Sequence, residues 1–171
     1  MWQRIFERKC KKMRRLLKIL FYLSFIVYLI ALINILFVGT RGFGFAQELT
    51  LIEYIRTRSN IVPFKTIMSY IDAFHYGTMN RDVPIKNLIG NFILFLPMSI
   101  YLPIIFNRLN SFKKCIITIL SILFLVEVTQ LVFKLGAFDI DDLILNLLGV
   151  LLGFSIYKLA LHFNIIKHLK V

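Results

Sequence analysis

The sequence predicts an all-α membrane protein: a bundle of four transmembrane helices with a long extracytoplasmic loop that carries one or two short interfacial helices. Hydrophobic residues make up 58% of its 171 residues, more than the roughly 45–50% of soluble domains. Lys and Arg are grouped between long apolar stretches, as in loops that touch anionic lipid. For this reason the net charge of +12 does not indicate a nucleic-acid partner, and membrane lipids are the partners expected first.

Four stretches are long and apolar enough to cross a bilayer, which takes about 20 residues. They are residues 19–38, 88–106, 115–133 and 143–163. Together with their connections they form a predicted transmembrane domain over residues 19–163. A basic segment, 1–18, precedes this domain, and a short tail, 164–171, follows it.

The distribution of Lys and Arg predicts the orientation, because short cytoplasmic loops carry the excess of positive charge. Residues 1–18 are rich in Lys and Arg, and both the connection 107–114 and the tail 164–171 contain basic residues and no acid. The loop 39–87 is mixed in sign and the loop 134–142 is net acidic. We therefore expect a multi-pass protein with both termini in the cytoplasm.

The start of the chain and its two cysteines have simple interpretations. A cleaved signal peptide is disfavoured, because the first apolar run is too long and no small-residue cleavage site follows Val38. Cys10 and Cys115 both fall on the predicted cytoplasmic side, so no disulfide is expected.

The outer loop is too long to be a passive connection. Its glycine-containing start at residues 41–45 argues against a helix there. Residues 48–58 could form one short helix, and a second is predicted from Pro63 to Gly77, where apolar residues recur at helical spacing. This second helix is too short to span, so we expect it to lie in the interface or to fold back on the bundle.

Polar side chains occupy the outer half of the last three spans. They are Asn87, Asn91, Glu127, Gln130, Asp139, Asp142 and Asn146. On each span the spacing of three or four residues places them on one helix face. Because a charged side chain within a span costs at least about 2.5 kcal/mol, it normally faces protein or water. We therefore predict a polar, acidic cleft that opens to the exterior and suits a cationic or hydroxyl-rich ligand.

A purely structural role for these residues is the alternative. Asn and Gln side chains can hold helices together, and one of the three aspartates near residue 140 is expected to cap the fourth span. Asp141 points away from the polar face and is expected to be solvated. Pro97 is expected to kink the second span, and Gly149 and Gly153 to allow close approach of two helices.

Three blocks of sequence resemble the signature of the VanZ-like family. They are Ser59-Asn-Ile-Val-Pro-Phe-Lys, Asn87-Leu-Ile-Gly-Asn-Phe-Ile-Leu-Phe-Leu-Pro, and Glu127-Val-Thr-Gln followed by Phe138-Asp-Ile-Asp-Asp-Leu-Ile-Leu-Asn-Leu-Leu-Gly-Val-Leu-Leu-Gly. The namesake of this family is associated with low-level resistance to teicoplanin, a lipoglycopeptide antibiotic. The resemblance implies a protein of the bacterial cytoplasmic membrane with an outward-facing site. It adds Asn60 to the cleft and gives structural roles to Pro63, Phe64, Pro97, Gly149 and Gly153.

The first functional hypothesis is a non-catalytic membrane protein that binds an exterior ligand, either a lipoglycopeptide or a lipid-linked cell-wall precursor. The alternative is a membrane-embedded enzyme in which Glu127 and either Asp139 or Asp142 act as an acid–base pair on a lipid-linked or cell-wall substrate. Against catalysis, the sequence has no Ser-His or Cys-His signature, no His-Glu-x-x-His motif and no glycine-rich phosphate loop. No cofactor and no metal are expected. A channel is disfavoured, because the polar residues do not extend into the cytoplasmic half of the spans.

Overall fold

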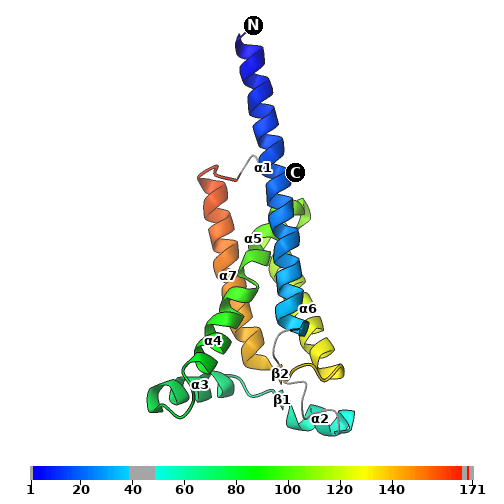
Figure 1. The fold of residues 1–171 in the computed structure, drawn as a ribbon, viewed down its shortest axis with the longest axis vertical. Helices are drawn as coiled ribbons and strands as arrows, with labels where there is room; N and C mark the ends of the chain where they lie inside the picture. Colours follow the sequence, from blue (N-terminus) through cyan, green and yellow to red (C-terminus); the bar gives the residue numbers. More distant parts are fainter. Residues whose placement is uncertain (1, 39–48, 167–168, 170–171) are drawn as a thin grey trace.

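The computed structural model describes residues 2–38, 49–166 and 169. Four of its helical segments are long and apolar enough to cross a membrane: Glu7–Val38, Asp82–Ile105, Phe112–Val132 and Ile140–His162. They run side by side, and both chain termini lie at the same end of the bundle (Figure 1). The predicted all-helical bundle of four spans is therefore confirmed.

The first span belongs to helix α1 (Trp2–Ile33), which continues as a π-helical turn, η1 (Asn34–Val38). It is longer than the predicted span, because the basic segment is helical as well. The N-terminal part of α1 projects well beyond the other helices (Figure 1). Its last turns pack on the core, where Leu32 and Leu36 are buried.

The second span consists of two helices, α4 (Asp82–Leu94) and α5 (Leu96–Ile105), separated by Phe95. Pro97 stands in the first turn of α5. Since proline has no N–H to donate, the helical hydrogen bonding is interrupted at this point. The hydroxyl of Tyr28 on α1 donates to the carbonyl oxygen of Leu94 at 2.9 Å, so α1 packs against the break.

The remaining spans are α6 (Phe112–Val132) and α7 (Ile140–His162), and the 3-10 helix η2 (Asn107–Asn110) links α5 to α6. Helix α7 packs against α4, α5 and α6 and is the centre of the bundle. Fully buried apolar side chains from these helices form the core: Phe95, Ile104, Ile119, Val150 and Tyr157. Outward-facing residues of the spans are apolar and exposed, as expected of surfaces that contact lipid tails.

The loop between the first and second spans contains two short helices, as predicted: α2 (Leu51–Thr57) and α3 (Lys65–Tyr76). We call it the outer loop because it lies at the end of the bundle away from the chain termini. Both helices lie across the end of the bundle opposite the termini (Figure 1). Helix α3 ends at Gly77, whose φ of +66° suits glycine. The glycine-containing start of the loop, residues 41–45, lies outside the described residues.

Helix α2 begins with a capping box in which Thr50 and Glu53 exchange hydrogen bonds. These hydrogen bonds from Thr50 lower the pKa of the Glu53 carboxyl. The helix is attached to the turn after α6, because the Tyr54 hydroxyl donates to the Gly136 carbonyl at 2.9 Å and Lys134 Nζ donates to the Leu49 carbonyl at 2.6 Å.

Between α2 and α3 the chain forms a two-residue strand, β1 (Ser59–Asn60), which pairs in parallel with β2 (Phe138–Asp139). The register aligns Ser59 with Phe138 and Asn60 with Asp139. This short pairing brings the outer loop to the first residues of α7.

Candidate functional site

The N-terminal end of α7 is where the outer loop meets the transmembrane bundle. Asp139 is the N-cap of α7, and its carboxylate accepts a hydrogen bond from the Asp141 N–H at 2.9 Å. The same carboxylate accepts from Asn60 Nδ2 at 3.0 Å and from the Thr66 hydroxyl at 2.6 Å. Asp139 therefore holds the loop to the helix.

Asp141 is fully buried, and the prediction that it is solvated was wrong. Its carboxylate accepts hydrogen bonds from three backbone N–H groups: Phe64 at 2.5 Å, Thr66 at 2.7 Å and Ile67 at 3.1 Å. These N–H groups lie at the start of α3, where a helix has no internal acceptors for them. Asp141 thus caps a helix that lies 75 residues earlier in the chain.

This cap explains a local feature of α3. Its N-cap residue, Phe64, has a left-handed backbone with φ of +66° and provides no side-chain hydrogen bond to the helix. A helix start without a capping side chain needs an acceptor from elsewhere. The missing cap is the signal in the sequence that could have indicated a distant carboxylate here. Besides Asp141, Thr66 is a site residue that the sequence did not indicate, and it bonds to both Asp139 and Asp141.

In the first two turns of α7, a second group of polar side chains links α7 to α4. Asn91 is buried on α4 and its Nδ2 donates to the carboxylate of Asp142. Asn146 is buried on α7, and its Nδ2 donates to the Asp142 carbonyl oxygen at 2.7 Å. We call Asn91, Asp142 and Asn146 the α4–α7 polar cluster.

Helix α6 contributes two further buried polar residues at the same end of the bundle. Glu127 is 5% exposed and Gln130 is 0% exposed. Gln130 Nε2 donates to the carbonyl oxygen of Leu36 at 2.6 Å, which ties α6 to the turn at the end of α1. Within the described part of the chain, two buried oxygens, Gln130 Oε1 and Asn146 Oδ1, have no hydrogen-bond donor.

Asn87 does not join these groups. It is half-buried, and its Nδ2 donates to the carbonyl oxygen of Val83 within its own helix at 2.9 Å. Asn87 and Asn91 share a helix face, as their spacing requires, but Asn91 bonds to α7 whereas Asn87 bonds within α4. Pro63 and Phe64 are exposed in the segment that leads into α3.

Gly149 and Gly153 lie where α7 crosses the break between α4 and α5. A Cβ atom on Gly149 would stand 1.8 Å from the Phe92 carbonyl oxygen, and one on Gly153 would stand 2.2 Å from Ser99 Oγ and 2.4 Å from the Leu96 carbonyl oxygen. Only glycine fits so close to a neighbouring backbone. This contact sets how closely α4 approaches α7 and therefore lets Asn91 reach Asp142.

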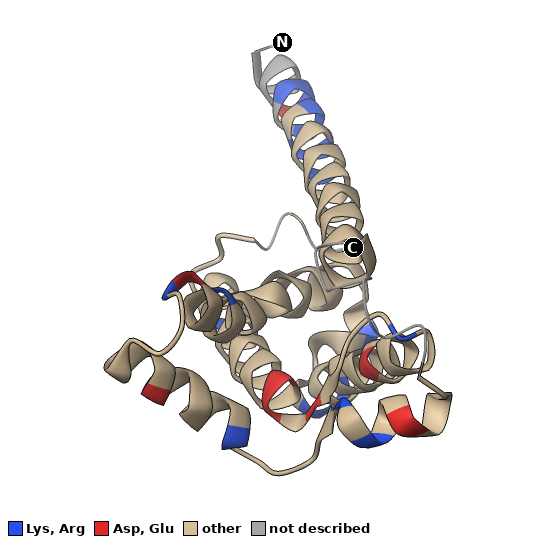
Figure 2. Cartoon of the chain, turned by 60° about the horizontal axis from the view of Figure 1, so that its bottom comes forward, with Lys and Arg blue, Asp and Glu red and all other residues tan. Residues whose placement is uncertain are grey.

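The charged side chains are distributed unequally between the two ends of the molecule. Figure 2 shows Lys and Arg concentrated on the projecting part of α1, whereas the opposite end carries most of the Asp and Glu, together with Lys and Arg on α2 and α3. Among the described residues no group of three His, Cys, Asp or Glu side chains is placed to hold a metal ion. The residues predicted to line the cleft are buried or half-buried, and an open cleft stays a prediction.

Four apolar helices, a helical outer loop and buried polar residues at one end define a multi-pass integral membrane protein. The VanZ/LLP1 family model matches residues 25–161. The chain therefore belongs to the VanZ/LLP1 family. It is 29% identical to Protein VanZ of Enterococcus faecium over 115 residues, which cover 63% of this chain and 70% of that protein. No solved structure matches the chain.

Proposed function

We propose that this chain is a protein of the bacterial cytoplasmic membrane that raises tolerance to teicoplanin or a related lipoglycopeptide by binding an exterior ligand. The family relationship supports a cell-envelope role. The observation that carries the proposal is the concentration of buried polar side chains at one end of the bundle. Four buried residues and the half-buried Asp142 come from three different spans: Asn91, Glu127, Gln130, Asn146 and Asp142.

The proposed orientation puts both termini in the cytoplasm and α2 and α3 outside. It is supported by the basic residues at the end that holds the termini, which include those of α1 and Arg108 in η2. At the opposite end the first turn of α7 is acidic. Because positive residues are retained on the cytoplasmic side, this distribution favours an exterior polar site.

The chemistry of the buried groups favours a ligand that donates hydrogen bonds. Carboxylates accept, and Gln130 Oε1 and Asn146 Oδ1, buried oxygens that have no donor among the described residues, are acceptors as well. A ligand with amine or hydroxyl groups would complement them. The exposed apolar residues of α3, among them Met68, Ile71 and Phe74, provide a surface beside this site for a lipid tail.

A titration with purified full-length protein in phosphatidylcholine nanodiscs tests the proposal. Teicoplanin and a lipid-linked cell-wall precursor are titrated separately, and we expect saturable binding of one of them. Glu127→Gln and Asp142→Asn should weaken that binding about tenfold or more, since a hydrogen bond to a charged group contributes about 1.5–3 kcal/mol.

Two exposed acidic residues give matched controls. Glu53→Gln and Asp72→Asn make the same chemical changes on α2 and α3, where the side chains face solvent, and should bind like wild type. Wild-type protein that binds neither ligand, or site variants that bind as well as the controls, would contradict the proposal.

A further inference from the structure

The contacts of Tyr101 show which part of α1 lies beside the end of α5. Its ring packs on Phe21 and Phe25, with ring centroids 4.9 Å and 5.0 Å away, and its hydroxyl donates to Ser24 Oγ at 3.0 Å. Helix α5 ends one turn after Tyr101, at Ile105, and α1 runs in the opposite direction (Figure 1). The end of α5 therefore lies beside the part of α1 that is about one turn before Phe21, close to Lys18.

Beyond that level α1 continues as a helix for four more turns, roughly 25 Å at 1.5 Å per residue. This projecting part carries exposed cations on several faces: Arg8, Lys9, Lys11, Lys12, Arg14 and Arg15. Glu7 is the acidic residue among them. A rigid helix holds these charges just past the apolar span, where headgroups lie.

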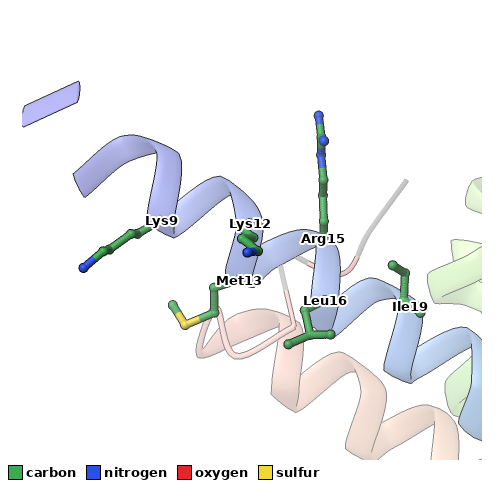
Figure 3. A pocket seen from close by; sticks show the side chains of 6 residues that line it. All are labelled: Lys9, Lys12, Met13, Arg15, Leu16 and Ile19. Atoms are coloured by element: carbon green, nitrogen blue, oxygen red, sulfur yellow. The ribbon is translucent and has the colours of Figure 1, made fainter. Parts of the chain in front are cut away.

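One face of this helix combines cations and apolar side chains in a particular order. A groove of about 450 Å³ is lined by Lys9, Lys12, Met13, Arg15, Leu16 and Ile19. Going toward the bundle, the lining changes from basic to apolar. Figure 3 shows Lys9, Met13 and Leu16 projecting to one side of this face, Arg15 and Ile19 projecting to the other, and Lys12 between them. The apolar residues are well exposed, with Met13 at 58% and Leu16 at 56%.

We propose that this groove binds an anionic phospholipid of the leaflet on that side, with its phosphate between Lys9 and Lys12 and an acyl chain along Met13, Leu16 and Ile19. The order of the lining residues matches the order of groups in the lipid, whose headgroup lies farther from the bilayer centre than its tails. A polyanion without an apolar part would use the cations and make no contact with Leu16 and Ile19. Anionic headgroups attract basic segments at the membrane surface for the same electrostatic reason.

The test measures lipid binding to the full-length protein in neutral detergent by native mass spectrometry. Phosphatidylglycerol and phosphatidylcholine with the same acyl chains are titrated, together with glycerol phosphate, which has the anionic group alone. Phosphatidylglycerol should bind about tenfold more tightly than either of the other two. Equal binding of the two lipids, or equal binding of glycerol phosphate, would overturn the proposal.

The helix offers a matched pair of double variants. Lys9→Gln with Lys12→Gln removes two cations from the groove, and Lys11→Gln with Arg14→Gln removes two from the opposite side of the same helix. We expect the first pair to weaken phosphatidylglycerol binding about tenfold and the second to change it less than about twofold. If both double variants lost phosphatidylglycerol binding equally, the attraction would come from the overall charge of the helix, and the proposal that the groove is the binding site would be overturned.

Discussion

The carboxylate of Asp141 accepts a hydrogen bond from the backbone N–H of Thr66 at 2.7 Å. This contact joins the first turn of a transmembrane helix to the first turn of α3 in the outer loop. Asp141 also accepts from Phe64 and Ile67, while Asp139 accepts from the Thr66 hydroxyl. The positions of α3 and α7 are therefore coupled, and a ligand that contacts one would also affect the other.

Replacing Asp141 by Asn should loosen α3 without unfolding the bundle. The amide retains one acceptor but turns an NH₂ group toward backbone N–H donors, so we expect a loss of about 1.5–3 kcal/mol in the stability of this contact. Hydrogen–deuterium exchange at residues 64–67 should become faster by at least tenfold. Asp72→Asn on the exposed side of α3 is the control, and equal exchange in the two variants would show that the cap does not hold the helix.

The close contact at Gly149 predicts a large difference between two glycine substitutions. Gly149→Ala places a methyl group against the Phe92 carbonyl oxygen, so the helices must separate, at a cost of about 1–3 kcal/mol or more. Gly90→Ala meets no neighbour within 4 Å and should be neutral or stabilising, by up to about 1 kcal/mol of helix propensity. Thermal unfolding in detergent measures both, and a Gly149 variant as stable as the Gly90 variant would argue against this packing.

A double-mutant cycle tests the contact between Asn91 and Asp142. The hydrogen bond from Asn91 to the carboxylate predicts a coupling free energy of about 1–3 kcal/mol between the two alanine substitutions. A parallel cycle with Asn87 and Asp142 should give a coupling near zero, because Asn87 bonds within its own helix. Comparable coupling in the two cycles would mean that the contact between α4 and α7 is not specific to Asn91.

Removing the Tyr28 hydroxyl should destabilise the break between α4 and α5. Tyr28→Phe leaves the Leu94 carbonyl without this donor and should lower the free energy of unfolding by about 1 kcal/mol. Tyr22→Phe removes a hydroxyl from another face of the same helix and should have less effect. The difference in unfolding midpoint between these two variants is the measurement, and no difference would count against the contact.

The fold was predictable because its signals are local and strong. Apolar runs of membrane length define the spans, and Gly77 marks the end of α3 through its backbone conformation. The break in the second span follows from Pro97, which has no N–H. Each of these depends on residues close together in the sequence.

The polar end was less predictable, because its contacts join distant segments. The helical spacing on α7 places Asp141 away from the polar face, which predicted that it is solvated. In the structure the loop segment at residues 64–67 covers that side of α7 and supplies three hydrogen-bond donors to Asp141. In the same way, the spacing on α4 could not show which of Asn87 and Asn91 bonds to α7. Only the approach of α7 permitted by Gly149 determines that Asn91 contacts Asp142.

The measurement that tests the central claim most directly is teicoplanin susceptibility in a sensitive bacterial host that expresses the protein. Wild type, Glu127→Gln, Asp142→Asn and the exposed control Glu53→Gln are compared at equal abundance in the membrane. We predict that wild type and the control raise the inhibitory concentration and that the two site variants do not. Equal tolerance in all four strains, or no effect of wild type, would contradict a role of the buried polar residues in tolerance.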